Sequence, residues 1–319
     1  MNTADDIKVS IVCNAYNHGK YIRDALNGFV MQKTDFDFEV LIHDDASTDD
    51  TADIIREFEA KYPHLIKPVY QTENQYSQGV SVTPTFQVPR IKGKYVAFCE
   101  GDDYWTDPLK LQKQYDAMEA HPEVDMCANA AVRKDGETGR ELSRICPADH
   151  DTILPLADVI AGGGGFIASA SLFYRTPLLF DLPKFRQIIR YDYTLQMQGA
   201  LRGGILYIHD FMTVYRAGVA GSWTKRVAFN VEKREKHMAK VREALLSLNE
   251  DTEGKYESII RTKIREDEFE LLRLRGDYKK MLSKEYGEFF RKLSAKNRLK
   301  VRLKAAFPFL ARVKRNFTK

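Results

Sequence analysis

The chain has 319 residues, of which 44% are hydrophobic and 29% are charged, and its formal net charge is +4. This length suffices for one large α/β domain with an appendage, or for two modest domains. The composition is that of an ordinary globular protein, and the 19 glycines and 11 prolines exclude a fibrous or largely disordered chain.

The sequence predicts neither a secretory signal nor a membrane span. Residues 1–8 hold two aspartates, and the apolar run at residues 9–13 is too short for a signal core. No uncharged apolar stretch approaches the ~20 residues that span a bilayer. The four cysteines form no Cys-x-x-Cys pair, which argues against structural zinc and against a disulfide framework. We therefore expect a cytoplasmic protein.

The first half of the sequence alternates between strand and helix patterns. Apolar runs typical of buried strands occur at residues 8–13, 38–43, 66–70 and 95–99. Helical spacing of apolar residues follows the first strand at residues 20–30, and it follows the second in a helix that Ser47 or Thr48 caps. This alternation predicts an α/β fold with a mostly parallel sheet and helices on both of its faces.

The pattern changes near Trp223. Before this residue the sequence predicts a helix at residues 109–118 and strands at residues 124–132, 166–174, 206–209 and 211–215. After it the apolar spacing is helical throughout. We therefore expect an α/β domain over residues 1–223 and a basic helical region over residues 224–319.

Polar clusters follow three of the predicted strands at the point where each strand ends. In such sheets ligands bind beyond the carboxyl ends of the strands, so the three clusters are expected at one edge. In chain order they are Asn14-Ala15-Tyr16-Asn17, Asp44-Asp45-Ala46-Ser47 and Glu100-Gly101-Asp102-Asp103.

The third cluster has two interpretations. Its carboxylates, from Glu100, Asp102 and Asp103, suit Mg²⁺ or Mn²⁺, which prefer oxygen ligands and often take only one or two from the protein. Such a cation stabilises a diphosphate leaving group as its bond breaks. The alternative is a solvated acidic turn that caps the next helix, a role for which Asp107 competes.

The remaining polar segments are equally open. Asp44 and Asp45 can accept hydrogen bonds from a base or a ribose, or they can favour the N-terminus of the next helix. Asn17 and its neighbours can form a plain turn. The four glycines at residues 162–165 fit a loop beside a substrate or simple flexibility. Neither G-x-G-x-x-G nor G-x-x-x-x-G-K-[ST] occurs, which argues against dehydrogenases and P-loop enzymes.

Three segments together resemble glycosyltransferase family 2, over roughly the first 220 residues. They read VSIVCNAYNHGKYI, VLIHDDASTDDT and GKYVAFCEGDDYW, in the family's order and strand context. The resemblance implies the GT-A fold and an inverting transfer of sugar from a nucleoside diphosphate, most often UDP. It also implies a Mn²⁺ or Mg²⁺ cofactor, and a saccharide or lipid-linked saccharide acceptor in bacterial surface polysaccharide assembly.

The resemblance also implies roles for single residues. The acidic segment is similar to the family's D-x-D-D element, with Asp102 as the foremost metal ligand and Asp103 in support; glutamate replaces the usual first aspartate. Asp44 resembles the aspartate that recognises the base. The residues expected at the nucleotide are Asn14, Tyr16, Asn17, Asp44, Asp45, Glu100 and Gly101.

Two later segments extend the resemblance. YDYTLQMQGALRGGILYI resembles the segment that bears the catalytic base, which would be Asp192; the alternative is a helix cap. FMTVYRAGVAGSW resembles a tyrosine-arginine segment that often continues to a histidine, where this chain has Gly218. Arg216 or Trp223 would then complete the phosphate site. Trp105 would stack on a sugar ring or pack in the interior.

The C-terminal residues are strongly basic. From residue 287 onward the sequence contains eleven Lys and Arg but only one Glu. Within residues 290–317 these basic residues alternate with apolar residues at helical spacing. This pattern favours binding of the C-terminal region to an anionic membrane surface, at the inner face of the plasma membrane. A helix packed on the catalytic domain, a homo-oligomer contact and nucleic-acid binding are the alternatives, and we expect no nucleic acid.

Two other functions remain open from the residues. A sugar nucleotidyltransferase would carry a glycine-rich, basic phosphate loop after the first strand, and CNAYNHGKYI is not one. A nucleotide-sugar-binding protein without catalysis would need no base at Asp192. The seven histidines show no metal-ligand spacing and are interpreted as structural or surface residues.

Overall fold

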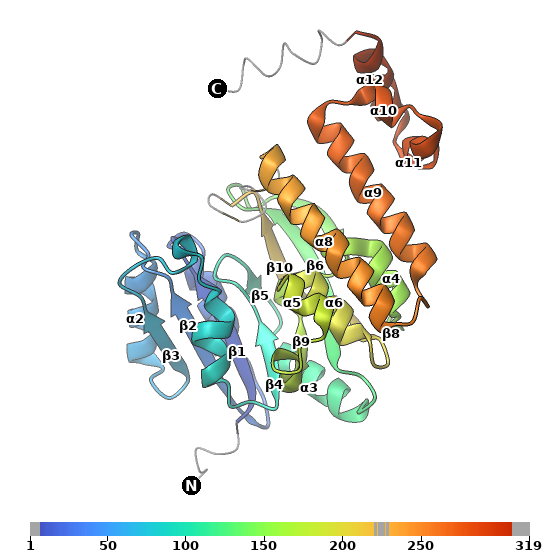
Figure 1. The fold of residues 1–319 in the computed structure, drawn as a ribbon. Helices are drawn as coiled ribbons and strands as arrows, with labels where there is room; N and C mark the ends of the chain where they lie inside the picture. The colour runs from blue at the N-terminus through green and yellow to red at the C-terminus, as the bar shows by residue number, and fades with distance from the viewer. Residues whose placement is uncertain (1–6, 220–221, 223–226, 228–229, 308–319) are drawn as a thin grey trace. The chain divides into compact units, whose positions relative to one another are not determined.

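The computed structural model describes residues 7–219, 222, 227 and 230–307. The chain divides into two compact units, Met1–Ser222 and Trp223–Lys319, and each is described by itself. Figure 1 shows that the first unit contains the sheet and that the second is helical.

Four parallel strands form the N-terminal half of the sheet. Their side-by-side order is β3-β2-β1-β4, and the pairing of β1 with β2 runs from Ile7 opposite Asp37 to Ala15 opposite Asp44. These strands hold near-continuous apolar runs because a parallel sheet is covered on both faces. Their bounds are β1 (Ile7–Ala15), β2 (Asp37–Asp44), β3 (Ile66–Tyr70) and β4 (Tyr95–Phe98).

The other half of the sheet is mixed. β9 lies between β4 and β6 and is antiparallel to both, whereas β6 and β10 are parallel to each other. Shorter antiparallel strands, β5, β7 and β8, pair with β10 or β6. The bounds are β5 (Tyr104–Trp105), β6 (Met126–Asp135), β7 (Glu141–Ile145), β8 (Thr152–Leu154), β9 (Phe173–Arg175) and β10 (Ile205–Ala217).

Two strand predictions in this half are wrong in extent. Only Phe173–Arg175 forms a strand within the region predicted at residues 166–174, because the chain turns at Ser169–Ser171, where the Ser171 hydroxyl and N–H both donate to the Ala168 carbonyl. The strands predicted at residues 206–209 and 211–215 are one strand, β10, with register shifts between Ile208 and Thr213. A bulge of this kind re-aims side chains without ending the strand.

Helices flank the sheet (Figure 1). α1 and α2 pack on the N-terminal strands through Ile22, Leu26, Phe29 and Ile55, which are all fully buried. α2 begins at Thr51 after Asp50, so the predicted cap at Ser47 or Thr48 is wrong. The bounds are α1 (Ile22–Val30), α2 (Thr51–Lys61), α3 (Lys110–Ala120), α4 (Leu156–Gly162), α5 (Lys184–Ile188) and α6 (Asp192–Ala200).

Trp105 belongs to the core of this unit. Its side chain is 2% exposed, its indole N–H donates to the Ala170 carbonyl over 2.8 Å, and its ring meets Phe29 edge-on at 5.0 Å between centroids. The ammonium of Lys110 lies 4.0 Å from the centre of the Trp105 ring, and burial lowers the pKa of Lys110 to about 7. Of the two interpretations of Trp105, packing in the interior agrees with the structure, because the side chain is buried and its N–H donates inside the protein.

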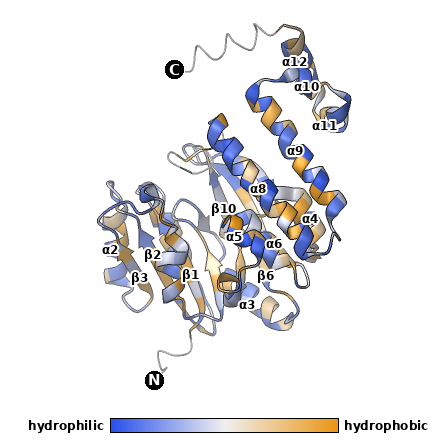
Figure 2. Ribbon diagram, in the orientation of Figure 1, coloured by the Kyte–Doolittle hydropathy of each residue, from blue (hydrophilic) through white to orange (hydrophobic). Residues whose placement is uncertain are grey.

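The second unit has its own apolar core. α8 pairs with α9, and Figure 2 shows hydrophobic and hydrophilic residues alternating along both. Gly276 ends α9 in the left-handed conformation (φ 79°) that a residue without Cβ adopts at low cost. The core is formed by Phe269, Leu272, Met281, Tyr286, Phe289, Phe290 and Val301. The helices are α8 (Val231–Asp251), α9 (Glu257–Arg275), α10 (Tyr278–Met281), α11 (Gly287–Lys292) and α12 (Ala295–Ala306).

Among the residues that the structure describes, none of the helices combines the length and the apolar character that crossing a bilayer requires.

The core position of Trp105 predicts a large effect on stability. Trp105→Ala should lower the free energy of unfolding by about 3–5 kcal/mol, because it removes a fully buried ring and leaves a cavity. Urea unfolding followed by circular dichroism measures this. The matched control is Phe180→Ala at a side chain that is 61% exposed, for which a change within about 0.5 kcal/mol is expected. Equal effects of the two variants would contradict the assignment.

Candidate active site

The structure brings the three polar clusters together at one edge of the sheet. The Asp45 N–H donates to the Ala15 carbonyl over 2.9 Å, and the Gly101 N–H donates to the Asn14 carbonyl over 3.0 Å. Because β1 is parallel to both β2 and β4, the loops that follow these strands leave the sheet in the same direction. The site is therefore built on three adjacent strand ends.

The loop after β1 is tied to the loop after β2. Asn17 has a left-handed backbone (φ 54°); its N–H donates to the Ser47 hydroxyl (2.9 Å), and its Oδ1 accepts the Thr48 N–H (2.8 Å). The His18 N–H donates to the Thr51 hydroxyl over 2.8 Å. Asn17 thus joins the two loops. Tyr16 is 42% exposed, so its ring is accessible at this edge.

Asp44 and Asp45 differ in what they bind. Asp44 is 2% exposed; its Oδ1 accepts the Ser47 hydroxyl (2.5 Å), and burial raises the pKa of its carboxyl. Asp45 accepts the backbone N–H of Gln75 (2.8 Å) on one oxygen and that of Tyr76 (3.1 Å) on the other. Asp45 therefore secures the segment after β3, and Asp44 is the better placed of the two for a ligand.

The acidic loop after β4 packs closely around a glycine. A Cβ on Gly101 would lie 2.7 Å from Ile22 Cδ1, 2.9 Å from His18 Nδ1 and 3.2 Å from Ala15 Cβ. Glycine is needed here for close approach rather than for backbone freedom. The sequence predicted this residue at the nucleotide, and its position against α1 and the first loop gives it a packing role as well.

Asp102 and Asp103 are 8% and 2% exposed. The Arg216 N–H donates to Asp103 Oδ1 (2.7 Å), its guanidinium donates to the Asp102 carbonyl (3.0 Å), and it also pairs with Asp24. The same guanidinium lies 4.3 Å from the centre of the Tyr104 ring. Arg216 thus holds the acidic loop in place from the end of β10.

The electrostatics of the acidic loop suit a cation. Burial, and next the charge of Asp102, raise the pKa of the Asp103 carboxyl well above its usual range. Two neighbouring carboxylates supply the hard oxygen ligands that Mg²⁺ and Mn²⁺ prefer, and a positive ion there offsets their repulsion. In the described part of the chain, no group of three or more His, Cys, Asp or Glu side chains could hold a metal ion. A metal at Asp102 and Asp103 would therefore take its remaining ligands from substrate and water.

Asp192 is the first residue of α6. Its side chain is partly buried, and burial raises the pKa of its carboxyl, while the charge of Arg186 lowers it. The Arg186 guanidinium donates to the Tyr191 carbonyl and the Thr194 hydroxyl, both over 3.2 Å, and to Gln198 Oε1 over 3.0 Å. This buried arginine fixes the first turns of the helix that carries Asp192.

The glycine run lies beside this helix. The 3₁₀ turn Gly163–Gly165 contacts α6, and a Cβ on Gly164 would lie 3.6 Å from Tyr193 Cβ and 3.7 Å from Tyr191 Cε1. These glycines therefore give the start of α6 a neighbour without side chains.

Comparison with known proteins assigns the family. The model of glycosyl transferase family 2 matches residues 10–220. The chain belongs to glycosyltransferase family 2. The predicted membership is thus confirmed, and with it the prediction that the protein is a glycosyltransferase.

Relatives of this family 2 enzyme are found in several bacteria. An uncharacterized protein of Mycobacterium tuberculosis is 39% identical over 247 residues, which are 75% of this chain and 68% of the relative. The Escherichia coli UDP-Glc:alpha-D-GlcNAc-diphosphoundecaprenol beta-1,3-glucosyltransferase WfaP is 33% identical over 127 residues, which are 40% of this chain and 47% of WfaP.

Solved structures confirm the predicted α/β fold of the GT-A type. Staphylococcus aureus TarS, crystallised with UDP-GlcNAc, has a TM-score of 0.61 and 20% identity, over 91% of this chain and 77% of the TarS chain. The Pyrobaculum calidifontis mannosyltransferase PcManGT, crystallised with GDP-Man and Mn²⁺, has a TM-score of 0.51 and 16% identity, over 96% of this chain and 88% of that one.

Two residues at this edge of the sheet, Thr83 and His18, were not assigned to the site by the sequence analysis. Asn14 Nδ2 donates to the Thr83 hydroxyl (2.9 Å), and Asn14 Oδ1 is buried with no hydrogen-bond partner among the described residues. His18 Nδ1 is likewise buried without a partner there, and it lies against Gly101. The place of His18 directly after the first cluster was a usable signal. Nothing in the sequence pairs Thr83 with Asn14, because 69 positions separate them.

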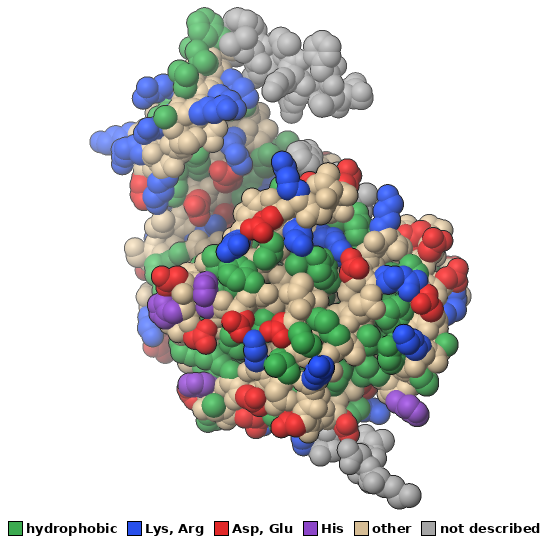
Figure 3. Space-filling view, turned by 180° about the vertical axis from the view of Figure 1, so that it is seen from behind, with side chains coloured by type: hydrophobic (Ala, Val, Ile, Leu, Met, Phe, Trp, Pro, Cys, Tyr) green, Lys and Arg blue, Asp and Glu red, His purple; other side chains and the backbone are tan. Residues whose placement is uncertain are grey.

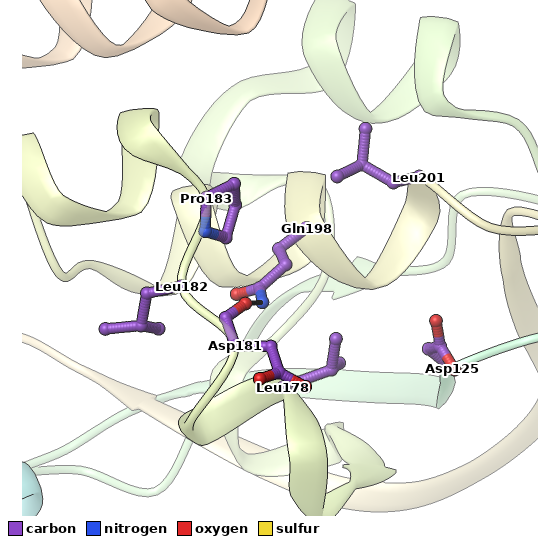
Figure 4. A pocket seen from close by; sticks show the side chains of 7 residues that line it. All are labelled: Asp125, Leu178, Asp181, Leu182, Pro183, Gln198 and Leu201. Atoms are coloured by element: carbon purple, nitrogen blue, oxygen red, sulfur yellow. Dashed lines mark hydrogen bonds between the residues drawn. The ribbon is translucent and has the colours of Figure 1, made fainter. Parts of the chain in front are cut away.

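The predicted site residue Trp223 lies outside the described residues. A hollow of about 460 Å³ is lined in part by α6, whose Gln198 amide donates to the Asp181 carbonyl over 2.8 Å. Figure 4 shows the residues around it. It is lined by Asp125, Leu178, Asp181, Leu182, Pro183, Gln198 and Leu201, none of which is a predicted site residue.

The close packing of Gly101 predicts the effect of adding a methyl group. Gly101→Ala should lower the free energy of unfolding by about 1–3 kcal/mol, because Ile22, His18 or the acidic loop must shift to admit it. The matched control is Gly165→Ala, whose Cβ would have no neighbour within 4 Å. Urea unfolding of both variants measures the difference. A Gly101 variant as stable as the control would show that the loop has room to spare.

Proposed function

We propose that this glycosyltransferase moves a sugar, with inversion, from a nucleoside diphosphate, chiefly UDP, to a saccharide or lipid-linked saccharide. The observation that carries the proposal is the junction of the three clusters at one sheet edge, where Asp102 and Asp103 are buried together. WfaP by its name uses UDP-Glc and a diphosphoundecaprenol-linked sugar, and TarS was crystallised with UDP-GlcNAc; both support this choice. We assign the reaction to residues 1–223 and an accessory role to residues 224–319.

In this proposal the first two loops bind the nucleotide. Asp44 accepts hydrogen bonds from the base, since its Oδ2 has only a long contact of 3.4 Å with the Ser47 N–H. The exposed ring of Tyr16 lies against the base or ribose. Asn14, whose Oδ1 has no hydrogen-bond partner in the part of the chain that the structure describes, lines the same nucleotide together with Glu100 and Gly101. Asn17 and Asp45 support these loops through the contacts described above.

The diphosphate lies at the acidic loop. Asp102 is the foremost ligand of Mn²⁺ or Mg²⁺ in this proposal, since one oxygen of Asp103 is engaged by Arg216. When bound, the metal neutralises the charge that develops on the departing diphosphate. Arg216 orients the acidic loop and adds positive charge beside it. The Mn²⁺ in the PcManGT crystal supports the same kind of cofactor.

Asp192 is the proposed general base. Its carboxylate takes the proton of the acceptor hydroxyl while that oxygen attacks the anomeric carbon from the side opposite the diphosphate. The raised pKa of Asp192 makes it a stronger base than an exposed aspartate, and the charge of Arg186 opposes part of that rise. A lipid-linked acceptor would bring the enzyme to the inner face of the plasma membrane as a peripheral protein.

Two carboxylate variants separate donor binding from transfer. Asp192→Asn should keep the thermal stabilisation that a UDP-sugar with Mn²⁺ confers, yet lose transfer by at least about 100-fold, the usual contribution of a general base. Asp102→Asn should lose the Mn²⁺-dependent stabilisation as well.

The control for both is Asp116→Asn, at an exposed residue on α3, which should behave as the unaltered enzyme. Transfer by Asp192→Asn at the unaltered rate would remove Asp192 from the mechanism. Absence of metal-dependent stabilisation by any UDP-sugar or GDP-sugar would overturn the donor assignment.

The opposing effects on Asp192 predict a pH dependence. Transfer requires the ionised carboxylate, so kcat/KM should fall as the pH drops through a pKa that burial has raised above the ordinary aspartate value. Arg186→Met removes the cation that lowers this pKa, so the acidic limb should move to higher pH. Arg186→Lys keeps a positive charge and should move the limb less.

The measurement is kcat/KM between pH 4 and pH 9 for the unaltered enzyme, Arg186→Met and Arg186→Lys. The midpoint of the acidic limb should be lowest for the unaltered enzyme and highest for Arg186→Met. Arg186→Met also removes the hydrogen bonds that the guanidinium donates to Gln198 Oε1 and the Thr194 hydroxyl, which should cost about 1–3 kcal/mol of stability. A purely structural role for Arg186 would lower the rate equally at every pH.

A further inference from the structure

α12 in the helical unit has two apolar faces. Val301 and Ala305 are 5% and 9% exposed, and Val301 belongs to the core of that unit. Leu299 and Leu303, four positions apart, are 59% and 44% exposed, and Phe307 at the end of the helix is 47% exposed. Residues at i, i+4 and i+8 form one stripe along a helix. The inner face is therefore used in packing, and the leucines of the outer stripe, Leu299 and Leu303, are exposed.

The outer stripe lies among basic residues. Two of the α12 cations contact aromatic residues of the same unit. Lys304 donates to the Tyr278 hydroxyl (3.0 Å), and the Arg302 guanidinium lies 5.6 Å from the centre of the Phe290 ring. Within residues 230–307, none of the α12 cations forms an ion pair with a carboxylate. Figure 3 shows Lys and Arg side chains gathered on this part of the chain. The basic residues of α12 are Lys296, Arg298, Lys300, Arg302 and Lys304.

The neighbouring helices are built differently. On α8 and α9, several exposed cations pair with carboxylates, as in Lys236 with Glu232 (2.7 Å) and Arg242 with Glu268 (3.1 Å). α12 holds no acidic residue at all. Its charge is therefore not balanced by its own side chains, and an anionic surface is the complementary partner.

We propose that the outer face of α12 binds the surface of a membrane that contains anionic phospholipids. Leu299, Leu303 and Phe307 enter the boundary between head groups and acyl chains, and Lys296 and Lys300, one turn apart beside the stripe, bind the phosphates. Long lysine side chains reach the head groups while the leucines insert. The interaction needs neither donor nor acceptor, so it stands or falls separately from the transfer reaction.

The same observations disfavour two other partners. A second copy of the chain, packed stripe to stripe, would bring the unbalanced cations of both copies together. Nucleic acid would engage the cations through its phosphates but would leave the exposed leucines without a role.

The test is sedimentation of the full chain with vesicles in the absence of nucleotide. Vesicles of phosphatidylcholine with 30 mol % phosphatidylglycerol should bind the protein, and pure phosphatidylcholine vesicles should not. Lys296→Gln with Lys300→Gln should weaken binding roughly 30-fold, the loss expected for two cations near an anionic surface. Leu299→Ser with Leu303→Ser should weaken it by roughly tenfold or more.

Matched controls lie on α8 of the same unit. Leu246→Ser changes a leucine that is 45% exposed, and Lys233→Gln with Lys240→Gln removes two exposed cations. Both controls should bind as the unaltered protein does. Circular dichroism should show unchanged helix content in every variant because all the altered side chains are exposed; Leu303→Ser alone replaces the double variant if that one loses helix.

Several outcomes would overturn the proposal. These are no binding to the anionic vesicles, equal binding by the serine variant, and equal losses in the α8 controls. A lower mass of the serine variant in light scattering would identify a second copy as the partner instead. Binding of a DNA duplex that needs the lysines but not the leucines would identify nucleic acid.

Discussion

Burial of two neighbouring carboxylates at the end of β4 is the constraint on which the site depends. Removing each charge from water costs several kcal/mol, and the two repel each other. Arg216 offsets part of this cost through its N–H to Asp103 and its guanidinium on the Asp102 backbone. Because the compensation is partial, the cation that we propose at this loop would offset the remaining repulsion between the two carboxylates. Gly101 permits this arrangement of the loop, since any side chain there would meet α1.

Hydrogen bonds between loops extend this rigid arrangement to the loops after β1 and β2. Asn17, in a left-handed conformation, joins the first loop to Ser47 and Thr48, and Asp45 holds the segment after β3 through two backbone N–H groups. Loops fixed in this way lose little conformational entropy when a ligand binds. At α6, Arg186 fixes the start of the helix through the Tyr191 carbonyl. Its charge also opposes the rise that burial causes in the pKa of Asp192.

The limits of prediction from the sequence follow from the range of each interaction. β1 to β4 were predicted within two residues at their ends, because their apolar runs report burial that is local in the chain. The region at residues 166–174 has a similar apolar run, yet only Phe173–Arg175 finds strand partners, on β4 and β6. The sequence allowed Trp105 either to stack on a sugar or to pack in the core, because its partners Phe29 and Ala170 are distant in sequence.

The sequence by itself determined the family, the α/β order of the first half and the three polar clusters at strand ends, since each is a pattern of adjacent residues. Tertiary structure decided which of these polar groups are engaged: Asp45 by a backbone segment, Asn17 by the second loop, and Asn14 by Thr83. It also decided which apolar face of α12 is buried. Periodicity shows that a helix has apolar faces, but only packing determines which face finds a partner within the chain.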